Sequence, residues 1–164
     1  MIKGIIFLFA VFMVGVSAAQ EAFIGKVIFV SDGDTLWARP VAGGPPRKLR
    51  IDGIDAPELC QSGGANSRDT LASLVLYQRV EVTIQRHDEY ARAVARLIFE
   101  KKDLGTQMVS SGSAWSYRWK GSRGPYLSEE IFARQARLGL FADDRPELPR
   151  NFRKRHGPCR SLMP

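Results

Sequence analysis

Residues 48–60 read KLRIDGIDAPELC, with alternating apolar and polar residues at the start, a glycine at 53 and a proline at 57. The first half is typical of a β-strand, because alternate side chains of a strand point to opposite faces. The second half is acidic: Asp52, Asp55 and Glu58 fall in a window of nine residues that begins at Arg50. The whole chain has a formal net charge of +7 and therefore attracts anions. Clustered carboxylates in such a chain indicate a bound cation.

Hydrophobic periodicity along the rest of the chain predicts five strands and three helices. The strands are expected at 21–42 (two, meeting near Ser31), 47–55, 79–86 and 92–102, and the helices at 66–78, 104–111 and 128–138. This order of three strands, a helix, two strands and further helices suits a small barrel with helices packed outside it. We expect an α+β fold that is mainly β.

The chain has 164 residues and 45% hydrophobic content, enough for one domain with a core and too little for two. Residues 1–19 combine Lys3, an apolar run and small residues at 17–19, which predicts a secretory signal peptide. The apolar run is short for a membrane span, and an uncleaved N-terminal anchor is the alternative. We expect export to the periplasm or the medium, with no stable membrane insertion after cleavage.

Cys60 and Cys159 are the two cysteines of the sequence, and export would place them where a disulfide persists. Their bond would tie a basic C-terminal tail, 146–164, to the segment after Glu58, leaving a domain over 20–145. Two free or intermolecular thiols are the alternative, because sequence does not give the Cα distance that a disulfide requires. The arginines and lysine at 153–155 would add non-specific affinity for phosphates or remain solvated.

Four carboxylates lie where predicted strands end. Asp32 and Asp34 belong to the turn SDGDT at 31–35, while Asp55 and Glu58 follow the third strand. Calcium and magnesium prefer carboxylate, carbonyl and water oxygens, so converging strand ends can hold such a cation. An ordinary turn is the alternative for DGD. Asp52 is interpreted as a solvated strand residue.

Arg50 and Arg92 are candidate phosphate ligands, because a guanidinium offers a fixed fork of donors to an anion. A solvated surface charge is the alternative for either one. Strict alternation places Arg50 and Asp55 on opposite faces of the strand. A bulge or twist near Gly53 would be needed to bring them together.

Three spaced blocks together resemble the thermonuclease family, the staphylococcal-nuclease-like nucleases: DGDT at 32–35, LRIDGIDAPE at 49–58 and DEYARAVARLIF at 88–99. The resemblance runs from residue 25 to residue 141. It implies an OB-fold five-stranded barrel with about three packed helices. It also implies metal-dependent hydrolysis of nucleic-acid phosphodiesters, with Ca2+ as the cofactor.

The resemblance further implies roles for individual residues. The metal ligands would be Asp34, Asp55 and the backbone carbonyl of Ala56. Arg50 and Arg92 would bind the phosphate, and Glu58 would be the general base. Asp32 would be a nearby acid that supports the site. Two positions depart from the family pattern. Ala91 stands where the family usually has glycine, and Glu89 stands where a lysine can bind a terminal phosphate.

The combined interpretation is a calcium-dependent endonuclease that acts as a monomer on DNA and RNA with low sequence specificity. The alternatives are a non-catalytic nucleic-acid-binding OB-fold module and a basic exported protein that binds anionic polymers. A binding module does not need the acidic residues and the arginines together, and this chain has both. Trp115, Tyr117 and Trp119 would stack on bases or pack in the core.

Overall fold

The computed structural model describes residues 20–90, 92–157 and 159. The predicted signal peptide at 1–19 and the departure at Ala91 lie outside the described residues. Among the helices that the structure describes, none is both long enough and apolar enough to cross a lipid bilayer.

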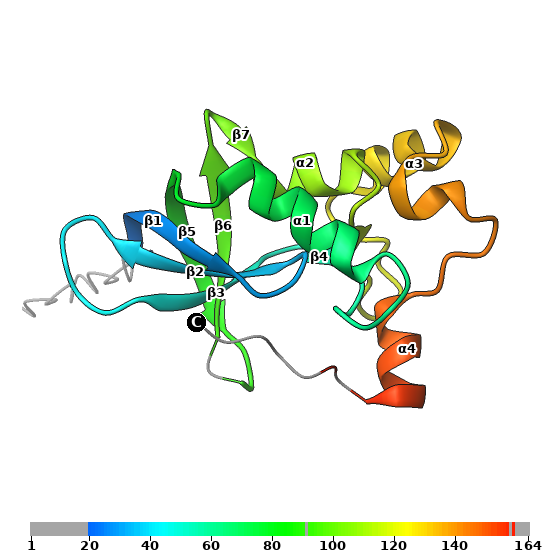
Figure 1. The fold of residues 1–164 in the computed structure, drawn as a ribbon, viewed down its shortest axis with the longest axis horizontal. Helices are drawn as coiled ribbons and strands as arrows, with labels where there is room; N and C mark the ends of the chain where they lie inside the picture. Colours follow the sequence, from blue (N-terminus) through cyan, green and yellow to red (C-terminus); the bar gives the residue numbers. More distant parts are fainter. Residues whose placement is uncertain (1–19, 91, 158, 160–164) are drawn as a thin grey trace, which may run out of the picture.

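Five strands close into a barrel (Figure 1). They are β1 (Ala22–Val30), β2 (Thr35–Pro40), β3 (Arg47–Ile51), β5 (Arg79–His87) and β6 (Ala93–Phe99). The strand order is β3-β2-β1-β5-β6, and a parallel pairing of β3 with β6 joins its two ends. A short β7 (Lys102–Asp103) pairs with β6. The predicted OB-type, mainly β architecture is confirmed.

Alternating apolar side chains fill the barrel interior. On β5, Val80, Val82 and Ile84 are buried, whereas Glu81 between them is exposed and Thr83 is half-buried. Leu36 on β2 and Leu49 on β3 are fully buried in the same cluster. Burial of such side chains stabilises the fold by about 1.5–3 kcal/mol each. The packed barrel therefore holds the residues at its strand ends in defined positions.

The described part of the chain has four α-helices, which gather on one side of the barrel (Figure 1). They are α1 (Gly64–Val75), α2 (Leu104–Ser110), α3 (Leu127–Gln135) and α4 (Pro149–His156), with a 3-10 helix η1 (Gly139–Ala142) before α4. The first three are the predicted helices with slightly different ends. Helix α1 stops before Gln78 because Tyr77 has a φ of +66°, which a helix does not accommodate.

The third strand predicted over 47–55 is in fact two strands. β3 ends at Ile51, and a short β4 (Ile54–Asp55) pairs with β8 (Trp115–Ser116) in a separate small sheet. Gly53 between them has a φ of +77°, and a Cβ there would lie 2.6 Å from Pro125. Glycine adopts this backbone readily and fits this space. The chain therefore turns at Gly53 and carries Asp55 away from the barrel sheet.

The segment expected to be a tail, 146–164, contains helix α4. Leu148 precedes the helix and packs against a small cluster that includes Trp115 and Phe141. Pro149 occupies the first turn, where a missing N–H costs no intrahelical hydrogen bond. Trp115 is 1% exposed, so of the two expectations for it the core one is confirmed, whereas Trp119 is 61% exposed.

The predicted disulfide between Cys60 and Cys159 is present. Their Cα atoms are 5.8 Å apart across a sequence separation of 99 residues. The end of the chain beyond α4 is thereby joined to the loop that follows β4. The expectation of a tail tethered near Glu58 is confirmed, although the tethered segment is partly helical.

Candidate active site

The turn between β1 and β2 directs Asp34 into the protein. Asp32 Oδ1 accepts a hydrogen bond from the backbone N–H of Asp34 at 3.0 Å, as in an Asx turn. Gly33 packs so closely on α1 that a Cβ would lie 1.8 Å from Ser67 Oγ. Asp34 is 4% exposed, and its Oδ2 accepts the N–H of Ala56 at 3.1 Å. The turn therefore places a carboxylate in the interior in addition to reversing the chain.

Arg50 joins the two inner carboxylates. Its Nη1 donates to both oxygens of Asp34 at 2.9 Å. Its Nη2 donates to Asp55 Oδ1 at 3.4 Å and to the carbonyl oxygen of Ile54 at 3.2 Å. The turn at Gly53 makes these contacts possible, because it moves Asp55 to the side that carries Arg50. Arg50 and Asp55, which strict alternation would place on opposite faces of one strand, therefore contact each other.

The buried carboxylates alter each other's pKa. Burial raises the pKa of Asp55, and the charge of Asp34 raises it further, against the lowering effect of two arginines. Burial, together with the charge of Asp34, raises the pKa of Asp32 to about 7. Burial alone would also raise the pKa of Asp34, but Arg50 and a backbone N–H outweigh it and lower the pKa. Crowded like charges disfavour ionisation, so added positive charge would stabilise this site.

Arg153 of α4 links Asp55 to Glu58, the predicted general base. Its Nη1 donates to Glu58 Oε1 at 2.7 Å. Its two terminal nitrogens lie 3.3–3.4 Å from the Asp55 carboxylate oxygens. Sequence reasoning does not find this contact, because no spacing relates residues that are 95 positions apart. The position of Arg153 within a basic run gives no signal that distinguishes it from its neighbours.

A cleft of about 940 Å³ opens over these groups. The predicted site residues that line it are Asp32, Arg50, Glu58 and Arg92, and Arg153 lines it as well. Tyr117 and Trp119 also face the cleft, where they could stack on bases. Asp34 and Asp55 lie beneath, in contact with Arg50.

Two other residues singled out from the sequence have partners of their own. Arg92 faces the cleft, but its Nε donates to Asp88 Oδ2 at 2.7 Å, within the turn between β5 and β6. Asp52 forms an ion pair with Arg86 at 2.8 Å. Arg92 thus lines the same cleft as Arg50 but pairs with Asp88 rather than with the inner carboxylates, and Asp52 lines the cleft as well.

Comparison with known proteins agrees with this geometry. A family model described as "Staphylococcal nuclease homologue" matches residues 48–143, more than half of the chain. The chain belongs to the staphylococcal nuclease family. The matched part includes Arg50, Asp55, Glu58 and Arg92, and it begins after Asp34.

Three relatives show how far the similarity to other members of the staphylococcal nuclease family extends. The chain is 33% identical over 147 residues to an uncharacterized endonuclease of Haemophilus influenzae, covering 90% of this chain and 82% of the relative. It is 32% identical over 147 residues to a micrococcal nuclease of Shigella flexneri, covering 83% of each. It is 32% identical over 129 residues to a probable staphylococcal-like nuclease of Oryza sativa subsp. japonica, covering 79% of this chain and 33% of the relative. These relatives support endonuclease activity, and hence a hydrolase with nucleic-acid substrates.

The donor set of this staphylococcal nuclease family member fits a divalent cation. Asp34 and Asp55 are buried side chains with hard oxygen atoms, and burial, with the charge of Asp34 as a further cause, raises the pKa of Asp55. Within the described residues no group of three or more His, Cys, Asp or Glu side chains is arranged to hold a metal ion. The carbonyl oxygen of Ala56 as a third ligand is what the family resemblance implies.

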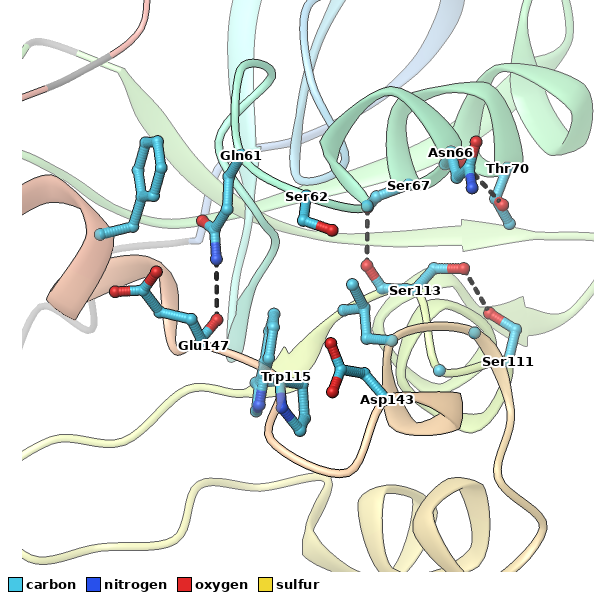
Figure 2. A pocket seen from close by; sticks show the side chains of 16 residues that line it. Gln61, Ser62, Asn66, Ser67, Thr70, Ser111, Ser113, Trp115, Asp143 and Glu147 are labelled. Atoms are coloured by element: carbon cyan, nitrogen blue, oxygen red, sulfur yellow. Dashed lines mark hydrogen bonds between the residues drawn. The ribbon is translucent and has the colours of Figure 1, made fainter. Parts of the chain in front are cut away.

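A second cavity, of about 560 Å³, lies beside the start of α1 (Figure 2). Ser67 Oγ donates to the carbonyl oxygen of Ser113 at 2.6 Å, and Gln61 Nε2 donates to that of Glu147 at 2.7 Å. None of the predicted site residues lines this cavity. Its polar contacts join the loop after Glu58 to the segment before α4, which is a structural role.

Proposed function

We propose that this chain is a calcium-dependent endonuclease that hydrolyses phosphodiester bonds of DNA and RNA with low sequence specificity. The observation that carries the proposal is the contact of Arg50 with Asp34 and Asp55 at the base of a cleft lined by Glu58 and Arg92. Buried carboxylates held by an arginine combine a cation site with a phosphate site. The relatives named endonuclease and micrococcal nuclease support the same activity.

In the proposed site, Asp34, Asp55 and the carbonyl oxygen of Ala56 hold the cation. Bound calcium would polarise the phosphate and offset the negative charge that grows on it. The N–H of Ala56 fixes the direction of the Asp34 carboxylate, to which it donates. Asp32 accepts the backbone N–H of Asp34 and so supports the same turn.

Arg50 and Arg92 bind the scissile phosphate and stabilise the charge that develops in the transition state. Burial would lower the pKa of Arg50, but Asp34 and Asp55 outweigh it and raise the pKa, so the guanidinium stays charged. A guanidinium has five N–H donors, so Arg50 can keep its carboxylate partners while it binds a phosphate oxygen. Glu58 accepts the proton of the water that attacks phosphorus.

We also propose that the chain is exported, to the periplasm or the medium, and acts as a monomer. The composition of residues 1–19 and the Cys60–Cys159 disulfide support export, because disulfides persist in oxidising compartments. N-terminal sequencing of the protein recovered from each cell fraction is expected to begin at Gln20. A form that begins at Met1 in the membrane fraction would support an uncleaved anchor instead.

The function is tested by incubating the processed protein with supercoiled plasmid, single-stranded DNA and RNA, with calcium, with magnesium or with a chelator. We expect calcium-stimulated cleavage of all three, including conversion of the closed circle to relaxed and linear forms, which requires internal cuts. Binding without cleavage under every ion condition would favour the non-catalytic OB-fold module. Equal binding to an unrelated anionic polymer would favour a charge-driven role.

A further inference from the structure

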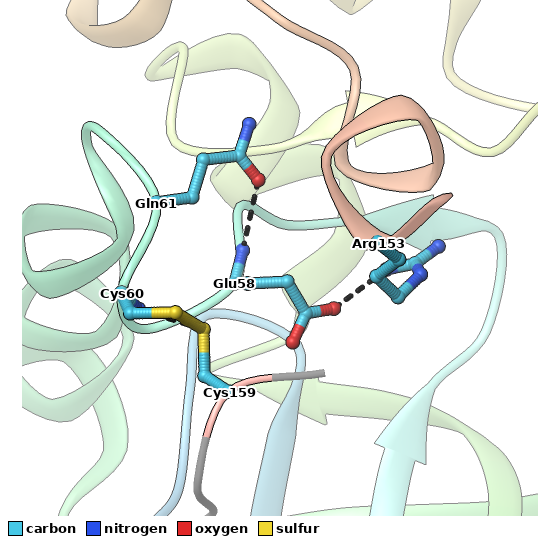
Figure 3. Close-up of a disulfide and its surroundings, with 5 residues drawn as sticks. All are labelled: Glu58, Cys60, Gln61, Arg153 and Cys159. Carbon is cyan, nitrogen blue, oxygen red and sulfur yellow. Dashed lines mark hydrogen bonds and ion pairs between the residues drawn. A yellow bond between two sulfur atoms is a disulfide. The ribbon is translucent and has the colours of Figure 1, made fainter. Parts of the chain in front are cut away.

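The loop that carries Glu58 is joined to the region of α4 at three successive points, two of which Figure 3 shows. Glu58 accepts from Arg153, Cys60 is bonded to Cys159, and Gln61 donates to the carbonyl oxygen of Glu147. Gln61 also accepts the backbone N–H of Glu58 at 3.2 Å through its Oε1. A short loop that bears the proposed general base is thus held by the C-terminal segment of the chain.

Glu58 is the main partner of Arg153. The 2.7 Å separation from Glu58 Oε1 is that of a charge-assisted hydrogen bond, whereas the 3.3–3.4 Å separations from Asp55 are longer than such bonds normally are. The side chains of Glu58 and Arg153 are 21% and 34% exposed, so the pair is partly shielded at the cleft edge. Glu58 is therefore the nearer of the two acids with which Arg153 pairs.

Helix α4 is anchored at both of its ends. Leu148 precedes its first turn and packs against the cluster that contains Trp115, while Pro149 is buried. Cys159 follows the last turn and is bonded to Cys60. With both ends held, the position of Arg153 in the middle of the helix is set relative to the Glu58 loop.

We propose that Arg153 is a positioning residue for Glu58, and that the Cys60–Cys159 disulfide keeps α4 where Arg153 reaches it. The inference rests on the proposed function, in which Glu58 accepts the proton of the attacking water. A glutamate on a loop samples several rotamers, and pairing with the rigid fork of a guanidinium limits them.

The positioning role is tested with the full processed chain, a fluorogenic DNA oligonucleotide and saturating calcium. Arg153→Gln is expected to lower kcat about 10- to 100-fold, as when supporting partners of site ligands are removed, with KM changed by less than about twofold. Arg153→Lys keeps the charge without the fork, so it is expected to recover part of the loss. Arg150→Gln removes an exposed arginine of the same helix and is the matched control, expected to match wild type.

The disulfide is tested in a double-mutant cycle. Cys60→Ser combined with Cys159→Ser is expected to lower kcat to a level similar to that of Arg153→Gln. Adding Arg153→Gln to the cysteine variant is expected to change kcat little further, because both act through the same contact. Independent, additive losses would overturn the role given to the disulfide. Unfolding midpoints of all variants, with assays run well below them, separate lost positioning from lost fold.

Other outcomes would overturn the role of Arg153 itself. An increase in KM at constant kcat would make Arg153 a substrate ligand, and an increase in kcat would make it an inhibitory contact. Kinetics identical to wild type would show that Glu58 needs no such partner. If the wild type cleaves no nucleic acid, the proposed function fails and this inference with it, so the two failures are told apart by the wild-type assay.

Discussion

The two sides of the cleft are built in different ways. On the strand side, Arg50 lies on barrel strand β3, Asp34 directly precedes β2 and Asp55 lies on the short β4, and both carboxylates are almost fully buried. On the loop side, Glu58 lies on a partly exposed loop and meets Arg153 from a helix near the end of the chain. The strand side depends on the barrel that forms the core. The loop side depends on a disulfide and on a few contacts with α4.

Because of this difference, we expect stability and activity to depend on different sides of the cleft to different degrees. On the strand side the same ion pairs contribute to both, because removing Arg50 would take the charged partner from buried Asp34. On the loop side the pair is near solvent, where ion pairs contribute little to stability. Substitutions on the two sides should therefore affect unfolding and cleavage in different proportions.

The largest effect on activity is expected for Glu58→Gln. Loss of the proposed general base should lower kcat by about 100- to 10,000-fold. The free energy of unfolding should change by less than about 1 kcal/mol, because the side chain is near solvent. Single-turnover cleavage and urea unfolding measure the two quantities, with Glu129→Gln, at a partly exposed position on α3, as control. Full calcium-dependent activity in the Glu58 variant would rule out the general-base role.

Arg50→Gln should damage both properties. We expect the free energy of unfolding to fall by about 3–5 kcal/mol, because buried Asp34 loses its charged partner and Asp55 loses one of its two arginines. Cleavage should fall by about 100- to 1000-fold as a phosphate ligand is lost. Arg47→Gln, on the same strand but paired with exposed Glu21, is the matched control and should cost less than about 1 kcal/mol. Equal unfolding curves for the two variants would contradict the comparison between the sides.

Removing the disulfide should lower the free energy of unfolding, because this bond holds the loop side of the cleft. For Cys60→Ser with Cys159→Ser we expect a loss of about 2–5 kcal/mol in the free energy of unfolding, since the bond closes a long loop. Urea unfolding of the variant and of wild type, with and without reductant, measures the loss. Wild type in reductant should approach the variant, and the variant should not respond to reductant. A response of the variant would indicate an effect unrelated to this bond.

The smallest effect is expected at the cleft rim, in the Asp88–Arg92 pair. Burial would raise the pKa of Asp88, but hydrogen bonds from the backbone and side chain of Arg92 outweigh it and lower the pKa. The ionised carboxylate therefore favours the folded state above about pH 4, and this contribution is lost as pH falls through the lowered pKa. Asp88→Asn should cost less than about 1 kcal/mol at pH 7, and the cost should be smaller near pH 2. Unfolding curves at both pH values test this, and an unchanged difference would refute it.

Much of the fold can be predicted from local pattern. The alternation of Val80, Val82 and Ile84 predicts β5, and the turn residues near Ser31 divide β1 from β2. The pattern fails at residues 47–55, because the turn at Gly53 depends on the approach of Pro125 and on pairing with β8. It also fails at α4, a short basic helix whose position depends on Leu148 and on the disulfide.

The candidate site divides in the same way. Asp34, Arg50, Asp55 and Glu58 are recognised from residue type, spacing and family resemblance, because they lie within or near one short stretch. Their arrangement in space cannot be predicted from the sequence, since alternation alone would place Arg50 and Asp55 on opposite faces of a strand. Arg153 cannot be identified as a site residue from the sequence, because no pattern around it indicates a contact with Glu58.

Local sequence is enough to establish the order of the strands and first three helices, the acidic and basic groups at strand ends, and the pair of cysteines that could join. Short-range sterics and side-chain periodicity carry that information. Only the folded arrangement shows that Arg50 and Asp55 share one side and that Arg153 holds Glu58 across 95 positions. Such contacts arise from packing between segments that are distant in the sequence, and the local residue pattern carries no information about that packing.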